Sequence, residues 1–308
     1  MRFRFLISSK KSFINTPYVI SFFISVFLFI SCNNENQKEN MTEAPTFENA
    51  AFKSGYSDVN GIKMYYESHG DKGDYLVLIH GGGSTIGTSF GTIVPMLSAE
   101  FRIIAVELQA HGHTNDRNSP ESFEQDADDV AALLHNLNIS KASFLGFSNG
   151  GNTAMQIAMR HPELVNKLIL ASTFYKREGF PNGFFEGMKQ ATIKDMPEVL
   201  KTAFLKITPD SSKLMTMFNK DRERMVQFKD WKDEDLRSIK APTLIINGDR
   251  DVVLPAHAVV MSGLIANSRL VILPATHGSY MGVSESSGVD TKMTKMTATI
   301  IEEFLNKQ

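Results

Sequence analysis

Short apolar runs and amphipathic stretches alternate along the chain from about residue 50 onward. Apolar positions at helical spacing predict helices over Ser122–Leu137, Asn152–Arg160 and Met293–Leu305. Continuous apolar runs, which are typical of strands buried on both faces of a sheet, occur at Tyr75–Ile79, Phe101–Leu108, Ala142–Phe147, Lys167–Ala171, Pro242–Ile246 and Arg269–Leu273. This alternation predicts an α/β protein with a mostly parallel sheet and helices on both faces.

Two segments depart from the alternation. Phe52–Val59 and Ile62–Ser68 are joined by Asn60-Gly61, a pair that favours a tight hairpin turn, so a β-hairpin is expected to open the fold. Residues 174–239 contain no strand-like run but many methionines and phenylalanines among charges, which predicts an insertion of short amphipathic helices. The expected core is then formed by residues 47–173 and 240–308.

The N-terminal segment combines positive charge with an apolar stretch. Arginines and lysines at positions 2, 4, 10 and 11 precede the run Tyr18–Ile30, which is apolar except for two serines. The run is shorter than the roughly 20 residues that a helix needs to span a bilayer, and it fits the apolar region of a secretory signal. Residues 1–31 are therefore expected to be a signal peptide that directs export.

Cys32 is the only cysteine in the chain and directly follows this apolar region. The order Phe29-Ile30-Ser31-Cys32 resembles the lipobox of bacterial lipoproteins, although Phe29 replaces the usual leucine. The resemblance implies a lipid on Cys32 that anchors the chain at the periplasmic or cell-surface side of a bacterial membrane, with the polar residues 32–46 as a flexible tether. The alternative is an ordinary signal peptide, or a short membrane anchor, with an incidental cysteine.

Composition and charge restrict the classes of partner. The formal net charge of −2 gives no basis for electrostatic binding of nucleic acid. Hydrophobic residues at 42% and charged residues at 21% describe ordinary globular material rather than a disordered chain. The sequence contains no metal-ligand cluster and no cofactor fingerprint that we can identify, so the chemistry is expected to rest on side chains alone.

A candidate nucleophile lies between a predicted strand and a predicted helix, in Gly146-Phe147-Ser148-Asn149-Gly150. This segment fits G-x-S-x-G, in which a sharp strand-to-helix turn exposes a strained serine. The flanking glycines lack Cβ atoms and let the two elements approach closely. Ser148 is therefore the candidate nucleophile, and a glycine-rich turn without chemical function is the alternative.

A serine nucleophile needs a base, and the base needs an orienting carboxylate. His277 is the best candidate base because it follows the last predicted strand, whereas its rival His257 is expected to begin a helix. Asp249 and Asp251 both follow the strand that ends at Ile246, where the carboxylate is expected. A carboxylate in such a turn is otherwise often a helix cap or a surface charge.

Two backbone N–H groups should face the negative charge that develops on a reacting carbonyl oxygen. One is expected from Asn149, the residue after the candidate nucleophile, and the other from the loop His80-Gly81-Gly82-Gly83-Ser84 after a buried strand. A phosphate-binding loop is the alternative for this glycine run, but no G-K-[ST] sequence follows it.

From about residue 50 to 308 the chain resembles the α/β-hydrolase superfamily. Within it, the chain is most similar to the branch of bacterial esterases, cofactor-free haloperoxidases, enol-lactonases and proline iminopeptidases. The motifs that carry the resemblance are, in chain order, His80-Gly81-Gly82, Ala110-His111-Gly112-His113, Gly146 to Gly151, Gly248 to Asp251, and His277. The chain order serine, aspartate, histidine also matches this fold, and the insertion takes the place of the cap domain of this branch.

The resemblance implies a role for particular residues. Ser148, Asp251 and His277 would form the catalytic triad, with Asp251 preferred to Asp249 because the branch places its acid at the last position of G-x-x-D. Gly82 and Asn149 would supply the oxyanion N–H groups. Asn149 stands where many relatives have methionine or glutamine, but its backbone N–H is unaffected by the side chain.

The implied activity is hydrolysis of a small acyl substrate, an ester, lactone or thioester, through an acyl-enzyme. An aminopeptidase or amidase, an acyltransferase, and a ligand receptor with slow turnover remain alternatives. An aminopeptidase would need an acidic cluster in the insertion to bind the substrate amine. Glu186, Asp195 and Glu198 are the candidates for that cluster, with ordinary surface charge as the simpler interpretation.

Overall fold

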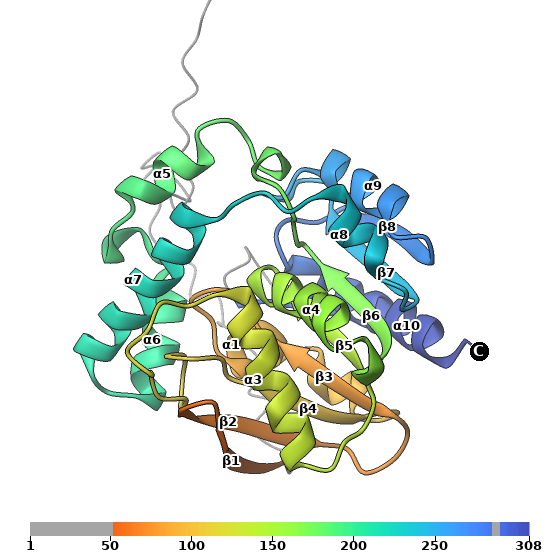
Figure 1. Ribbon diagram of the computed structural model, residues 1–308, viewed down its shortest axis with the longest axis horizontal. Helices are drawn as coiled ribbons and strands as arrows, with labels where there is room; N and C mark the ends of the chain where they lie inside the picture. The colour runs from red at the N-terminus through yellow and green to blue at the C-terminus, as the bar shows by residue number, and fades with distance from the viewer. Residues whose placement is uncertain (1–51, 285–289, 308) are drawn as a thin grey trace, which may run out of the picture.

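The computed structural model describes residues 52–284 and 290–307 of the chain. Residues 1–31, the tether and Cys32 lie outside these ranges. The described part contains an eight-stranded sheet with the strand order β1-β2-β4-β3-β5-β6-β7-β8 (Figure 1). The strands are β1 (Lys53–Val59), β2 (Ile62–His69), β3 (Tyr75–Ile79), β4 (Arg102–Val106), β5 (Ala142–Phe147), β6 (Val165–Ala171), β7 (Thr243–Gly248) and β8 (Ser268–Leu273).

The sheet is antiparallel at one edge and parallel elsewhere. β1 pairs with β2, and β2 with β4, in antiparallel orientation, whereas every pairing from β4 through β3 to β8 is parallel. The hairpin between β1 and β2 turns at Asn60 and Gly61, whose φ angles of 42° and 89° are those that a tight two-residue turn requires. The predicted hairpin and mostly parallel sheet are thus confirmed.

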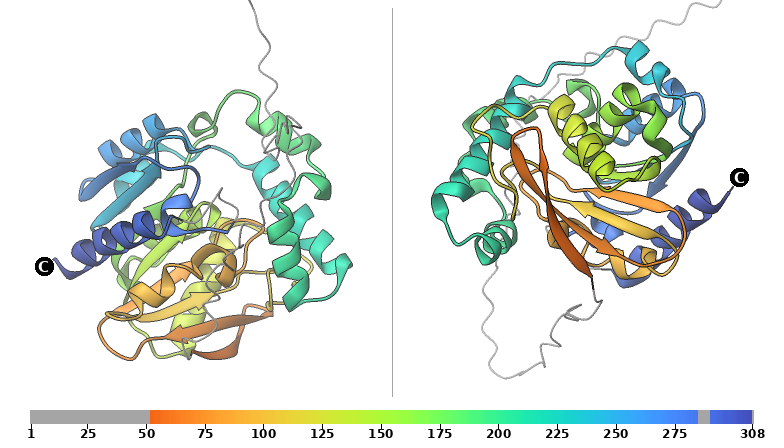
Figure 2. Two further views of the ribbon diagram at one scale, coloured as in Figure 1. Left: turned by 180° about the vertical axis from the view of Figure 1, so that it is seen from behind. Right: turned by 60° about the horizontal axis from the view of Figure 1, so that its bottom comes forward.

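Helices cover both faces of the sheet (Figures 1 and 2). α3, α4 and α9 pack in one apolar cluster with Val77 and Ile79 of β3, and α1, α2 and α10 pack in another with Leu76 and Leu78. Alternate residues of a single strand therefore enter different cores, as expected for a strand buried on both faces. The helices are α1 (Ile86–Phe90), α2 (Val94–Leu97), α3 (Phe123–Asn136), α4 (Asn149–Arg160), α9 (Pro255–Leu264) and α10 (Thr291–Asn306).

All the regular secondary structure between β6 and β7 is helical. Its α-helices are α5 (Phe184–Gln190), α6 (Glu198–Ile207), α7 (Ser211–Gln227) and α8 (Asp233–Ser238). α5, α6 and α7 group at one end of the sheet, away from the C-terminal end of α10 (Figure 1). α8 differs from them, because its Leu236 is buried in the core cluster that contains α4 and α9.

The boundaries of the predicted strands and long helices lie close to the observed ones. β3 and β5 span the predicted residues, whereas α4 begins at Asn149, before the predicted start at Asn152. α1 and α2 were not predicted, because each is too short to show helical periodicity. Within residues 52–284 and 290–307, none of the helices combines the length and the apolar character needed to span a bilayer.

Candidate active site

Ser148 occupies a strained turn between β5 and α4. Its φ of 52° and ψ of −121° lie outside the regions that residues with a side chain normally adopt. A Cβ atom on Gly146 would lie 2.3 Å from the Gly150 carbonyl oxygen, and a Cβ on Gly150 would lie 2.1 Å from the Ile79 carbonyl oxygen. Both glycines are therefore required by close backbone contacts, as the G-x-S-x-G pattern predicts.

The loops after β7 and β8 bring a carboxylate and an imidazole together. His277 Nδ1 lies 2.7 Å from Asp251 Oδ1, and the Asp251 side chain is fully buried. Asp249, the alternative acid, is exposed and accepts a hydrogen bond from the Ala275 N–H at 2.9 Å. The geometry thus places Asp251, and not Asp249, against His277.

Further donors surround the Asp251 carboxylate. The Ser172 hydroxyl donates to Asp251 Oδ2 at 2.5 Å, and the Val253 N–H donates to Oδ1 at 3.0 Å. The Tyr280 hydroxyl lies 2.7 Å from Ser172 Oγ. Burial alone would raise the pKa of Asp251, but His277 and these donors lower it below its ordinary value, so the carboxylate is ionised at neutral pH. Ser172 and Tyr280 were not singled out from the sequence, since no motif surrounds them.

Gly82 and Asn149 both line the cavity that contains Ser148. Within the described residues, neither backbone N–H has a hydrogen-bond acceptor. A Cβ on Gly82 would lie 2.6 Å from Asn149 Nδ2, so a side chain at position 82 would displace that of Asn149. The two N–H groups expected for an oxyanion hole therefore flank the candidate nucleophile and are available to a ligand.

The other buried histidines have structural partners. His80 Nε2 accepts from the Leu108 N–H at 3.1 Å, and burial followed by the nearby His111 charge lowers the pKa of His80 to about 3. His257 lies in the first turn of α9, as expected, and accepts from the Tyr175 N–H at 3.2 Å. Burial lowers the pKa of His257 to about 4, and its ring stacks on Tyr175 away from the cavity lining.

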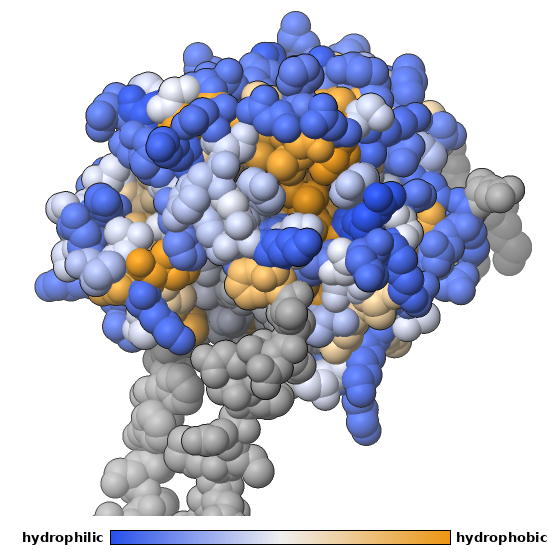
Figure 3. Space-filling view, turned by 90° about the horizontal axis from the view of Figure 1, so that it is seen from below, coloured by the Kyte–Doolittle hydropathy of each residue, from blue (hydrophilic) through white to orange (hydrophobic). Residues whose placement is uncertain are grey.

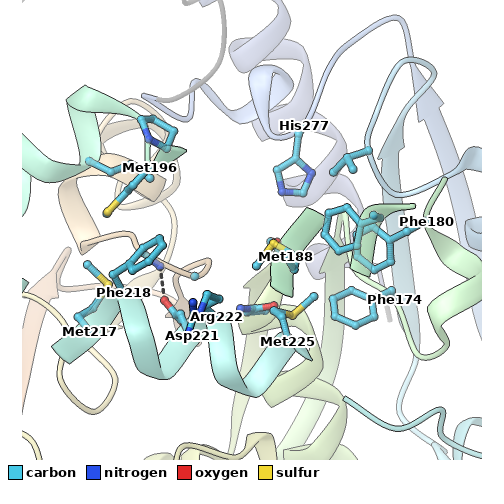
Figure 4. Close-up of a pocket in the computed structure, with 18 of the residues that line it drawn as sticks. Phe174, Phe180, Met188, Met196, Met217, Phe218, Asp221, Arg222, Met225 and His277 are labelled. Carbon is cyan, nitrogen blue, oxygen red and sulfur yellow. Dashed lines mark hydrogen bonds between the residues drawn. The ribbon is translucent and has the colours of Figure 1, made fainter. Parts of the chain in front are cut away.

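The cavity at this site has a volume of about 450 Å³, within the range of small-molecule pockets. Ser148 and His277 come from the core, and most of the remaining lining comes from the insertion (Figure 4). On the face of the molecule drawn in Figure 3, an apolar recess lies between polar rims. The apolar lining residues are Phe174, Phe180, Phe184, Met188, Met196, Pro197, Leu200, Met217, Phe218, Met225 and Val252.

A buried network of charges joins the insertion to the core beside this cavity. Asp221 of α7 lies 2.9 Å from His111 Nε2, is paired with Arg224, and accepts from the Gly83 N–H of the glycine loop, residues 80–84. Arg224 also pairs with Asp126 of α3 at 2.7 Å. Asp221 therefore holds the glycine loop from the insertion side.

The charges in this network stabilise one another. Burial alone would lower the pKa of His111, but the Asp221 carboxylate raises it to about 9. Burial alone would raise the pKa of Asp221, but His111 and Arg224 lower it well below its ordinary value. Both groups are thus charged at neutral pH.

The sequence of α7 contains a signal for this network. Leu214, Met217, Phe218 and Met225 form an apolar stripe along α7, and Asp221 interrupts that stripe at a buried position. An acidic residue at such a position indicates a partner across the interface. In contrast, none of Glu186, Asp195 and Glu198 lines the cavity. Among the described residues, no group of three or more histidine, cysteine, aspartate or glutamate side chains is arranged to hold a metal ion.

Comparisons with known proteins agree with this architecture. A family model described as alpha/beta hydrolase fold matches residues 74–215. The human serine hydrolase BPHL is 29% identical over 235 residues, which cover 70% of this chain and 77% of that protein. The pimeloyl-[acyl-carrier protein] methyl ester esterase of Nitrosospira multiformis is 28% identical over 244 residues, which cover 69% of this chain and 90% of that protein.

Solved structures show the same fold. The enol-lactonase of Burkholderia xenovorans LB400 superposes with a TM-score of 0.65 at 24% identity, over 82% of this chain and 100% of that protein. At this identity the likeness concerns the fold alone, and the sequence relatives carry the indication of hydrolase activity. Together these comparisons show an enzyme with the alpha/beta hydrolase fold.

Proposed function

We propose that this hydrolase cleaves a carboxylic ester, lactone or thioester through an acyl-enzyme formed on Ser148. The observation that carries the proposal is the Asp251–His277 contact of 2.7 Å in the same cavity as a serine with a φ of 52°. A buried, ionised carboxylate on Nδ1 favours the imidazole tautomer whose Nε2 can accept a proton. This arrangement supports acyl transfer better than a binding role without turnover.

The proposed reaction has two halves. Ser148 Oγ attacks the acyl carbon while His277 Nε2 takes the hydroxyl proton, and the N–H groups of Gly82 and Asn149 stabilise the oxyanion. His277 then gives the proton to the leaving oxygen or sulfur, and the acyl group stays on Ser148. In the second half, water attacks the acyl-enzyme, His277 takes its proton, and the acid is released as Ser148 regains its hydrogen.

The proposed mechanism favours esters over amides as substrates. Esters release an alkoxide that requires less protonation than an amine, so they place a smaller demand on His277. The lining of the cavity by phenylalanine and methionine supports an acyl or alcohol part with an apolar portion. In this proposal the helices α5 to α7 act as a cap that shapes the substrate site.

Labelling with a fluorophosphonate probe tests the nucleophile. Wild-type protein is expected to react, and Ser148→Ala is expected to lose the label with an unchanged thermal unfolding midpoint. Ser140→Ala, at an exposed serine before β5, is the matched control and should label like the wild type. Absence of labelling in folded wild-type protein would exclude the proposed mechanism, and persistent labelling of Ser148→Ala would assign the nucleophile to another residue.

We also propose that the enzyme is exported and held at a bacterial membrane by a lipid on Cys32. The support is the sequence alone, namely the position of the single cysteine directly after the apolar run. Metabolic labelling with a fatty acid should mark the full-length chain in membranes and should not mark Cys32→Ser. Equal labelling of the two forms would contradict the proposal.

A further inference from the structure

Arg222 is a cation in the wall of an otherwise largely apolar cavity. It lies on α7 with Asp221 and Met225, on the side of the cavity across from His277 (Figure 4). Arginine carries its charge at any physiological pH, and its planar donor edge matches a carboxylate. A cation at this place therefore bears on which substrates the site accepts.

The donors of Arg222 are only partly used by the protein. Its Nη1 donates to the Ala191 carbonyl oxygen at 3.2 Å. Its Nε–H is buried and has no acceptor among the described residues. An unpaired buried donor costs free energy and calls for an explanation. The edge formed by Nε and Nη2, which is the edge that binds carboxylates side-on, is left without a protein partner in the part of the chain that the structure describes.

The nearby carboxylate does not neutralise this cation. Asp221 is the next residue along α7, but its oxygens accept from Arg224, His111 and the Gly83 N–H. No carboxylate of residues 52–284 or 290–307 lies within 4.0 Å of the Arg222 nitrogens. The charges of His111 and Arg224 face those of Asp221 and Asp126, so this network is close to neutral without Arg222.

In the described part of the chain, the cavity offers no free carboxylate to bind an ammonium group of a substrate. Asp221 is the only carboxylate among the described lining residues, and three donors already occupy its oxygens. Arg222, in contrast, offers free donor capacity and an uncompensated positive charge. The cavity is therefore better suited to an anionic group than to a cationic one.

On these grounds, and resting on the proposed ester hydrolysis, we propose that Arg222 binds a carboxylate carried by the substrate. The substrate class is then a half-ester of a dicarboxylic acid, or an ester of a hydroxy acid, with an apolar segment between the carboxylate and the scissile bond. The carboxylate pairs with Arg222 while the ester carbonyl lies at Ser148 and the oxyanion N–H groups. Arg222 is a specificity-determining residue in this arrangement and takes no part in bond breaking.

Two pairs of ester probes test the proposal. In the first, mono(4-nitrophenyl) glutarate is compared with the neutral 4-nitrophenyl ester of 4-carbamoylbutanoic acid, and in the second, 3-acetoxybenzoate with 3-acetoxybenzamide. Wild-type enzyme is expected to show a higher kcat/KM for the anionic member of at least one pair. Arg222→Gln should lower kcat/KM for that anionic ester by about 10- to 100-fold, the usual size of a lost charge-assisted hydrogen bond, and leave the neutral ester within about twofold.

Two further variants make the test specific. Arg222→Lys keeps the charge but loses the planar edge. Its kcat/KM for the anionic ester should therefore lie between those of the wild type and Arg222→Gln. Lys213→Gln removes a positive charge from an exposed position on the same helix and should change neither ester. Hydrolysis of the neutral ester by Arg222→Gln also reports that this variant is folded and active.

The outcomes separate the two proposals. If neutral and anionic esters are hydrolysed equally in both pairs, or if Arg222→Gln affects the two members equally, the carboxylate site is wrong and ester hydrolysis stands. If folded wild-type enzyme hydrolyses none of the four esters, the proposed hydrolysis is wrong and the carboxylate site fails with it.

Discussion

The core and the insertion line the same cavity but position their polar groups in different ways. In the core, Ser148 directly follows β5 and His277 lies in the loop after β8, and their placement follows from local backbone geometry. In the insertion, Asp221 and Arg222 lie in the middle of a helix, and their placement follows from how α7 packs. With the proposed roles, the reaction chemistry would depend on local backbone geometry, and substrate choice would depend on how a distant helix packs against the core.

This difference predicts unequal effects of single substitutions. A change of Asp251 to asparagine in the core should affect the reaction far more than it affects folding. The amide oxygen can still accept from the Ser172 hydroxyl or the Val253 N–H, but the amide cannot hold His277 as the carboxylate does. A change in the insertion at Asp221 should affect folding strongly, because its carboxylate joins α7, the glycine loop and His111. Measuring activity and stability for both residues tests whether the two regions are separable.

The largest effect is expected for Asp251→Asn. The NH2 group of the asparagine can donate to His277 Nδ1, which places the imidazole proton on Nε2. Nε2 then cannot accept the serine proton, so kcat/KM should fall by about 10,000-fold. The measurement is the hydrolysis of a neutral 4-nitrophenyl ester. Asp249→Asn is the matched control and should stay within about twofold of wild type, because Asp249 is exposed and an amide oxygen can still accept from the Ala275 N–H. Equal losses in both variants would remove Asp251 from its proposed role.

The second effect is on stability and concerns Asp221→Asn. The substitution leaves the buried His111 and Arg224 charges without this counter-charge, which is expected to lower the free energy of unfolding by about 3–5 kcal/mol. Urea unfolding at pH 7 measures the change. Asp210→Asn, at the N-cap of the same helix, is the control and should cost little, since asparagine also caps helices well. A loss no larger than that of the control would show that the network does not hold the insertion to the core.

The sequence predicted the core more completely than the insertion for a physical reason. The turn at Ser148 depends on Gly146 and Gly150, which touch backbone that is close in space whatever the side chains around them. Asp251 lies at a fixed number of residues after β7, so its approach to His277 depends on two adjacent parallel strands. Constraints of this kind require particular residues at fixed spacings, and these spacings can be recognised in a single sequence.

The Asp221 network leaves no comparable pattern. Its partner His111 is separated from Asp221 by 110 positions, and the pairing depends on how α7 docks on the loop after β4. The acidic residues that an amine-binding site would have needed, such as Glu186 and Glu198, are exposed and lie outside the cavity lining. Helical periodicity identifies which residues face inward but not which surface they meet, so the lining of the cavity required the structure.

The smallest of the three effects is a pH dependence that comes from the same network. His111 has a pKa of about 9 in the folded protein against 6.5 for an ordinary histidine, because Asp221 outweighs the opposing effect of burial. The folded state thus binds more protons than the unfolded state between about pH 6.5 and 9, and the free energy of unfolding must fall as the pH rises through this window. Burial also raises the pKa of Glu121, which changes stability in the same direction.

The decline should reach about 3 kcal/mol for His111 by the upper end of the window, as its shift of pKa implies. Urea midpoints measured from pH 6.5 to 9 give the slope. His111→Gln removes this titrating group and should make the decline clearly smaller, with the remainder due to Glu121, whereas His135→Gln, at an exposed histidine of α3, should leave the decline unchanged. A curve that stays steep in His111→Gln would assign the titration to other groups. A flat curve in the wild type would mean that His111 is neutral beside Asp221.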